Sequence, residues 1–214
     1  MYQPTHGHFR EERLDVQHAL IPSHPFGALV SLGPSGLVAN HFPFVLDAGT
    51  GPLGTLRAHM ARANGQWQEL DGDRDALVIF QGHHSYVTPS WYPAKVETGK
   101  VVPTWNYALV HVYGRPRMIH DQEWLLRHVS ELSDKEEASQ PTPWQVSDAP
   151  ADFVAALAKA IVGIEIEIVR IEGKWKMSQN QPVPSREGVV RGLTARGDER
   201  SLAVAGLVAE TLGR

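Results

Sequence analysis

The sequence predicts an α+β fold in which an antiparallel barrel of short strands carries its helices on the outside. Short apolar or alternating runs fill the first half of the chain and are separated by Gly, Pro, Asn and Asp. This spacing is typical of antiparallel barrels and sandwiches. A helical stretch and a late alternating strand follow, and strands do not alternate with helices as they do in a βαβ fold.

The first half begins with a helix expected over residues 11–21, which ends before Pro22 because proline is a poor fit inside a helix. The Gly33-Pro34-Ser35-Gly36 break indicates a hairpin turn between the first two strands. The strands expected in this region are 26–32, 37–44, 53–59, 76–81 and 107–113.

A longer helix is expected after Asp121, whose side chain can cap its first turn. Leu125, Val129 and Leu132 recur at helical spacing and predict one buried face. The polar run 133–143 then reads as a surface loop.

A second helix is expected to open at Asp148 and to be closed by Gly163. Residues 164–168 alternate Ile and Glu, which predicts a strand with one buried and one acidic face. The last segment carries two weaker helical patterns around Gly197. We expect residues 1–184 to form the barrel domain with an N-terminal arm and inserted helices, and residues 185–214 to form a peripheral helical segment.

Composition narrows the classes of function. The formal charge is −4 and the pI is near 6.2, so the chain as a whole does not attract the phosphates of nucleic acid. The absence of cysteine excludes disulfides, thiolate metal sites and a cysteine nucleophile. The N-terminus lacks the apolar run of a signal peptide, and no stretch is apolar enough to span a membrane. We therefore expect a soluble cytoplasmic protein.

Two further classes lack their motifs. Neither the dinucleotide-binding G-x-G-x-x-G pattern nor a P-loop is present. The zinc motif H-E-x-x-H is also absent, and His83 and His84 would point apart on a strand. No metal site is therefore predicted.

The segment from Phe80 to Tyr107 is the densest collection of rings and polar groups, and it is expected to be a binding loop. Its groups suit a planar heteroaromatic ligand with an anionic tail, although an aromatic structural loop would have the same composition. The candidate residues are Gln81, His83, Tyr86, Ser90, Trp91, Tyr92, Lys95, Thr104, Trp105 and Asn106.

Three other clusters are candidates for the same chemistry. Arg57 and His59 would share one face of a strand, and Arg62 with Asn64 could close over a phosphate, although such cations are often only solvated. The ANHFP run places polar Asn40 in an apolar strand. The GKWKMSQNQ run supplies Lys176, Ser178 and Gln179 beside a tryptophan, and an edge-strand interface could use the same residues.

These motifs carry a family resemblance. HPFGALV, ANHFPF, GPLGTLRAHMARAN, VTPSWYPAK, VPTWNY and EGKWKMSQN occur in the same order as in PaiB-type FMN-binding negative transcriptional regulators, and the chain resembles that family over almost its whole length. The resemblance implies an FMN-binding split β-barrel, related in fold to pyridoxamine 5'-phosphate oxidase, that works as a homodimer with flavin sites at the dimer interface.

The resemblance also suggests where a flavin would contact the chain. Arg57, His59, Arg62 and Asn64 are expected near the phosphate and ribityl end, because a dianion suits cations better than a neutral ring does. Asn40, Trp105, Lys176, Ser178 and Gln179 are then expected around the isoalloxazine, and Lys95 is the cation of the binding loop. Haem is the alternative cofactor, with His8, His83, His84 or the Met60 thioether as ligands.

Two classes of function stay open. One is a flavin-binding regulator or sensor without turnover, and the other is a flavin-dependent oxidoreductase of a small substrate, since the cofactor itself carries the chemistry. Direct DNA binding has little support from charge. The final segment carries five Arg against four acidic residues, a net of 5 − 4 = +1.

Overall fold

The computed structural model describes residues 1–4, 7–70 and 74–213. The chain divides into two compact units, and each is described by itself. The first unit contains residues 1–20, 81–111 and 172–214, and the second contains residues 21–80 and 112–171.

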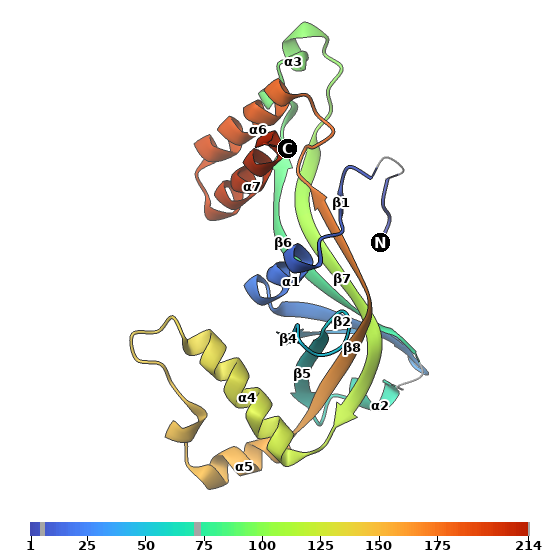
Figure 1. Cartoon of the computed structure of the whole chain (residues 1–214), viewed down its shortest axis with the longest axis vertical. Coiled ribbons are helices and arrows are strands. Elements are labelled where there is room, and N and C mark those ends of the chain that lie inside the picture. Colours follow the sequence, from blue (N-terminus) through green and yellow to red (C-terminus); the bar gives the residue numbers. More distant parts are fainter. Residues whose placement is uncertain (5–6, 71–73, 214) are drawn as a thin grey trace. The chain divides into compact units, whose positions relative to one another are not determined.

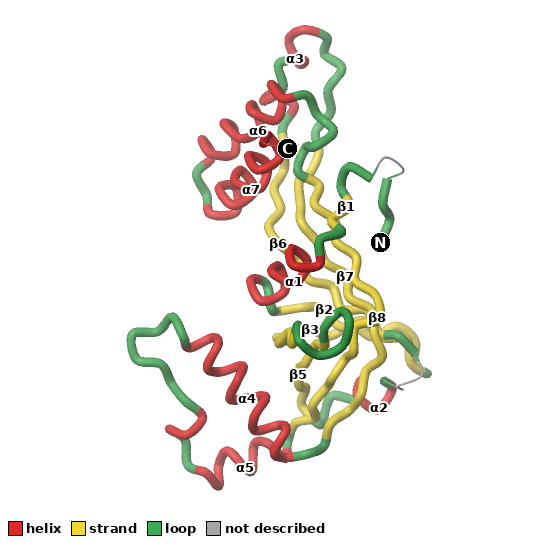
Figure 2. Tube along the Cα trace, viewed as in Figure 1, coloured by secondary structure: helices red, strands yellow, loops and turns green. Residues whose placement is uncertain are grey.

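Figures 1 and 2 show the elements along the chain. The strands are β1 (Arg10–Glu11), β2 (Phe26–Gly33), β3 (Gly36–Pro43), β4 (Val45–Asp47), β5 (Thr55–Ala61), β6 (Ala76–Val87), β7 (Thr104–Ile119) and β8 (Ile161–Lys176). The α-helices are α1 (Leu14–Ser23), α2 (Gln66–Glu69), α3 (Ala94–Glu97), α4 (Gln122–Glu137), α5 (Ala151–Lys159), α6 (Val183–Arg196) and α7 (Glu199–Glu210). Short 3-10 turns are η1 (Pro89–Trp91), η2 (Val146–Asp148) and η3 (Thr211–Gly213).

The second unit is built on a sheet with the strand order β3-β2-β6-β7-β8-β5-β4. Strand β2 pairs antiparallel with β3 and with β6, and β5 pairs antiparallel with β4 and with β8. The predicted hairpin is present, because Gly33 pairs with Gly36 across the Pro34-Ser35 turn. Gly36 has a φ of 102°, a backbone conformation that residues other than glycine rarely adopt.

The alternating run of β8 behaves as its sequence predicts. Ile164, Ile166 and Ile168 are buried, whereas Glu165 and Glu167 between them are partly or fully exposed. Successive side chains of a strand point to opposite faces, so the isoleucines supply one wall of the core and the glutamates the outer face.

Several predicted boundaries are wrong. Helix α1 does not end before Pro22 but contains it one residue from its end, where the missing N–H removes a single helical hydrogen bond. Helix α4 continues into the first part of the run expected to be a loop and ends at Glu137, so only the rest of that run is a loop. The ion pair between Lys135 and Glu131, 2.9 Å long, supports the last turns of the helix. Gly163 closes no helix, because β8 already begins at Ile161.

The expected binding loop is shorter than predicted. Strand β6 continues to Val87 and β7 begins at Thr104, so His83, His84, Tyr86 and Trp105 lie on strands. Only residues 88–103 connect them, and this connection contains η1 and α3.

In the first unit, the C-terminal segment forms the helix pair α6 and α7, which turns at Gly197 with a φ of 75° (Figure 1). The indole of Trp91 packs against α6 so closely that a Cβ at Gly192 would collide with the ring. The guanidinium of Arg196 lies 4.8 Å from the centre of the same ring and donates to Ser85 and to the carbonyl of Tyr86. Helix α6 therefore holds the start of the 88–103 connection in place.

None of the helices in the described ranges is both long and apolar enough to cross a membrane.

Candidate functional site

Arg57 and His59 lie on the same face of β5, as their spacing predicts. Leu56, Ala58 and Met60 alternate with them and are buried in the core of the second unit. The two basic side chains therefore point away from the apolar core and toward the face that α4 covers.

Helix α4 brings two side chains, Glu131 and His128, against this pair. Glu131 forms an ion pair with Arg57 Nη2 at 2.9 Å. Asp47, at the end of β4, lies 3.9 Å from the same nitrogen. The ring of His128 meets that of His59 edge to face at 5.3 Å and stacks on Trp124 at 5.1 Å. We call the group Arg57, His59, His128 and Glu131 the β5–α4 cluster.

Four nitrogens of this cluster are buried and have no hydrogen-bond partner among the described residues. They are Arg57 Nε, His59 Nδ1 and both ring nitrogens of His128. A buried polar atom without a partner costs about 1 to 3 kcal/mol. Such atoms are rare in folded proteins, and several in one place indicate a site that a ligand or water completes.

Burial also changes the titration of the two histidines. Burial lowers the pKa of His59. The pKa of His128 is lowered to about 4, first by burial and then by the charges of His59 and Arg57, which Glu131 only partly offsets. Both rings are therefore neutral at pH 7, when each carries one N–H donor.

Gly163 explains how α4 comes so close to the sheet. It pairs with His59 across β5 and β8, and a Cβ at this position would collide with the indole of Trp124. The missing side chain leaves the room that Trp124 fills, and Trp124 in turn carries the ring of His128.

Arg62 has a different set of partners from Arg57. Its Nε donates to the carbonyl of Lys159 at 2.9 Å and its Nη2 to that of Ile161 at 2.8 Å, while Nη1 lies 3.3 Å from His120. Its backbone carbonyl accepts from Trp67. These bonds tie the end of α5 and the start of β8 to the turn after β5, so most of the guanidinium donors already have a structural role.

Asn40 and Asn64 meet at Gln66, a residue that the sequence did not single out. Asn40 Nδ2 donates to Gln66 Oε1 at 2.9 Å, and Asn64 Oδ1 accepts from the Gln66 N–H at 3.0 Å. Gln66 is 2% exposed and also donates to Ser31 Oγ at 3.0 Å. This network ties α2 to strands β2 and β3.

In the first unit, Lys176 at the end of β8 is held against β7. Its ammonium donates to Thr104 Oγ1 and, at 2.7 Å, to the carbonyl of Trp105. Burial, followed by the charge of Lys174, lowers the pKa of Lys176. The indole of Trp105 is 53% exposed.

Ser178 and Gln179 shape the turn that follows Lys176. Ser178 is buried, exchanges hydrogen bonds with Asn106, and has a φ of 63°, the one positive value outside glycine in the described chain. Gln179 accepts from the N–H of Met177 at 2.6 Å and donates to the carbonyl of Trp175 at 2.5 Å. Both side chains therefore hold the turn itself.

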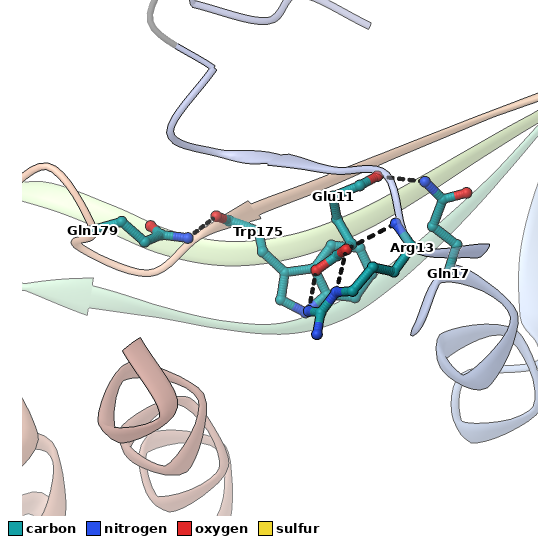
Figure 3. Close-up of polar contacts among 5 residues, drawn as sticks. All are labelled: Glu11, Arg13, Gln17, Trp175 and Gln179. Carbon is teal, nitrogen blue, oxygen red and sulfur yellow. Dashed lines mark hydrogen bonds and ion pairs between the residues drawn. The ribbon is translucent and has the colours of Figure 1, made fainter. Parts of the chain in front are cut away.

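The N-terminal strand packs beside this turn (Figure 3). The carboxylate of Glu11 accepts two bonds from the guanidinium of Arg13, at 2.6 and 2.8 Å, and one from its N–H at 3.0 Å. Gln17 donates to the Glu11 carbonyl, while Gln179 donates to the carbonyl of Trp175. These bonds stay within the N-terminal segment and within the turn after β8, whereas β1 is joined to β8 by the antiparallel pairing of Arg10 with Lys174 and of Glu11 with Gly173.

The remaining predicted residues show no shared centre. Lys95 Nζ donates to Ser90 Oγ at 2.8 Å on the surface of the 88–103 connection. The Met60 thioether, a suggested haem ligand, is only 2% exposed and belongs to the core. Within the described ranges, no three His, Asp or Glu side chains are placed to hold a metal ion.

His128 and Glu131 are the cluster residues that sequence reasoning missed, and only His128 has a signal in the sequence. It lies three residues after Leu125 and four before Leu132, on the predicted buried face of α4. A histidine on an apolar helical face is the signal that could have identified it.

Comparisons with known proteins match this chain to a family. The family described as "Putative FMN-binding domain" matches residues 1–170. An uncharacterized protein of Emericella nidulans is 38% identical over 94% of both chains. The chain belongs to this FMN-binding domain family. Protease synthase and sporulation protein PAI 2 of Bacillus subtilis is 27% identical and covers 99% of this chain and 98% of its own, so the predicted PaiB resemblance is confirmed.

Solved structures support the fold of this FMN-binding domain family member. The flavocytochrome Anf3 of Azotobacter vinelandii has a TM-score of 0.58 at 11% identity, covering 81% of this chain and 72% of its own. A FAD and heme binding protein of Mycobacterium smegmatis has a TM-score of 0.55 at 14% identity, covering 77% of this chain and 71% of its own. The predicted α+β fold, an antiparallel split barrel with peripheral helices, is confirmed.

The region matched by the FMN-binding domain family divides the predicted site. It contains Asn40, Arg57, His59, Arg62 and Asn64, as well as Lys95 and Trp105. It ends before Lys176, Ser178 and Gln179. The assignment of each residue to a flavin stays a prediction.

Proposed function

We propose that this protein binds FMN and that Arg57 and His59 of β5 hold the phosphate. The observation that carries the proposal is the pair of buried nitrogens, Arg57 Nε and His59 Nδ1, which lie on one strand face without partners in the described part of the chain. The pair lies inside the region that the FMN-binding domain family matches.

The donor set fits a phosphate. Arginine offers a planar fork of N–H donors that suits phosphate oxygens, and a neutral histidine with its proton on Nδ1 adds one more. The ion pair to Glu131 occupies Nη2 and leaves Nε available. When bound, FMN supplies one- and two-electron transfer chemistry.

Replacing Arg57 with Gln should weaken FMN binding about 10- to 100-fold, because hydrogen bonds to charged groups contribute about 1.5 to 3 kcal/mol. Riboflavin lacks the phosphate, so its affinity should not change. Both affinities are measured by flavin fluorescence quenching on protein freed of ligand.

The matched control is Arg117→Gln, which removes an exposed arginine of β7 that pairs with Glu165. It should leave both affinities unchanged. Equal losses of FMN and riboflavin affinity in Arg57→Gln, in a variant whose circular dichroism is that of the wild type, would refute the phosphate placement.

Replacing Glu131 with Gln should have the opposite effect. The carboxylate competes with phosphate for Arg57, and a partly exposed ion pair contributes up to about 1 kcal/mol, so FMN affinity should rise by up to about fivefold. The fluorescence titration measures this change. A weaker FMN affinity would show that Glu131 orients Arg57 rather than competing for it.

The proposal extends to a flavin-dependent regulator working as a homodimer. The full-length similarity to a Bacillus subtilis protein named for protease synthesis and sporulation supports a regulatory role.

Turnover is tested by reducing bound flavin with NADH or NADPH and following its reoxidation in air. Slow reduction by both donors favours a sensor, and rapid cycling favours an oxidoreductase. Parallel addition of haemin tests the alternative cofactor through its Soret band.

A further inference from the structure

Three aromatic rings gather on one face of the first unit, beside Lys176. His84 and Tyr86 are two residues apart on β6, so their side chains share a face. The Trp105 indole of β7 lies 5.9 Å from the ring of Tyr86 and 6.1 Å from that of His84. We call these rings and Lys176 the ring platform.

Two of the three rings of the platform are open to solvent. Trp105 is 53% exposed and Tyr86 is 39% exposed. Both sit on regular strands, and Trp105 is held by its backbone carbonyl, which accepts from Lys176. A rigid, exposed indole offers a large surface for stacking at little cost in side-chain entropy.

Lys176 supplies a positive charge that no carboxylate balances in the described chain. Its two acceptors, Thr104 Oγ1 and the Trp105 carbonyl, are neutral, and its Nζ lies 6.0 Å from the centre of the Phe9 ring. The charge of Lys174 contributes to lowering the pKa of Lys176. Two bonds leave one of its three N–H donors available. A half-buried ammonium without a counter-ion is unfavourable, and an anion would relieve this.

The backbone beside Lys176 is fixed in a strained form. Ser178 adopts a left-handed conformation and is held there by Asn106 and by the phenol of Tyr92. A conformation of this kind costs about 1 to 3 kcal/mol and is concentrated at functional sites. The turn thus fixes the end of β8, where the ammonium is attached.

We propose that the ring platform binds a planar aromatic carboxylate, which stacks on Trp105 and places its carboxylate at Lys176. This proposal replaces the expectation that Trp105 and Lys176 flank the isoalloxazine, and it does not depend on the phosphate contact proposed at Arg57. Single-stranded nucleic acid is less suited, because it requires several cations along its backbone and the platform has one uncompensated charge.

The test is calorimetric titration of the full chain with 2-naphthoate, both without flavin and with saturating FMN. We expect binding in both states. Neutral 2-naphthamide, which has nearly the same shape, should bind the wild type at least tenfold more weakly. This comparison needs no variant, so it does not depend on the folding of one.

Two variants locate the site. Lys176→Met and Trp105→Leu should each weaken 2-naphthoate binding at least tenfold. The matched controls are Lys159→Met, an exposed lysine of α5, and Trp144→Leu, an exposed tryptophan of the second unit, and both should bind as the wild type does.

Three results would overturn the proposal: no binding of 2-naphthoate to the wild type at millimolar concentration, equal affinity for the amide, or unchanged affinity in both variants. Loss of riboflavin binding in Lys176→Met, or displacement of FMN by 2-naphthoate, would also overturn it, because the rings would then belong to the flavin site. Failure of FMN binding alone leaves the naphthoate titration interpretable, so the two proposals fail separately.

Discussion

The protein should lose stability as the pH falls from about 6.5 to about 4, because the ring nitrogens of His128 are buried and have no hydrogen-bond partner in the described part of the chain. Its pKa is lowered to about 4 in the folded chain, from an ordinary value of 6.5. Between these values the unfolded chain binds a proton that the folded chain does not. The free energy of unfolding therefore decreases as the pH is lowered. The full effect is about 3 kcal/mol, and about 1.4 kcal/mol is already lost at pH 5.5.

His128→Leu should remove this part of the acid sensitivity. The variant also deletes two unpartnered ring nitrogens, so its stability at pH 7.5 should equal or exceed that of the wild type. Urea denaturation at pH 7.5 and 5.5 gives the difference between the two proteins. The control is His41→Gln, an exposed ring of β3 that stacks on Phe26. If His128→Leu and the wild type lose equal stability between the two pH values, His128 is not the group responsible.

The second large effect is expected at Gly192 of α6. Alanine is usually the better helix residue by about 1 kcal/mol, so a glycine in a helix is normally improved by this change. At Gly192, however, the new methyl group would overlap the indole of Trp91, and overpacking typically costs about 1 to 3 kcal/mol. Gly192→Ala should therefore lower the midpoint of urea denaturation.

Gly206 of α7 provides the matched control. It is a helical glycine with open space around its Cβ position, so Gly206→Ala should raise the denaturation midpoint by the equivalent of up to about 1 kcal/mol. Opposite signs at the two glycines would support the packing of Trp91 on α6. A stabilising effect at both positions would show that the indole moves away without cost.

Local signals in the sequence were sufficient for much of the fold. The hairpin at Gly33 to Gly36 and the Ile/Glu alternation of β8 both appear as predicted. Asp121 also caps α4 as predicted, since its carboxylate accepts from the Trp124 N–H at 2.7 Å. Each of these features depends on neighbouring residues alone, so it can be predicted without the tertiary structure.

Features that depend on distant residues were harder to predict. The rings and polar groups of His83 to Tyr86 read as a loop, yet they lie on β6, where one strand face need not be apolar. The carbonyls that accept from the Arg62 guanidinium lie almost a hundred residues away in the sequence, so no local pattern indicates these bonds. Gly163 looks like the end of a helix, although its role is to make room for a tryptophan on another element.

That close approach of Trp124 to Gly163 constrains how the sequence can diverge. Any relative that gains a side chain at 163 must give up the indole at 124, because the two would fill the same space. The ring of His128 would then lose the surface on which it stacks. Positions 124, 128 and 163 are therefore expected to vary together among homologues, as a single inherited unit that joins two elements distant in the sequence.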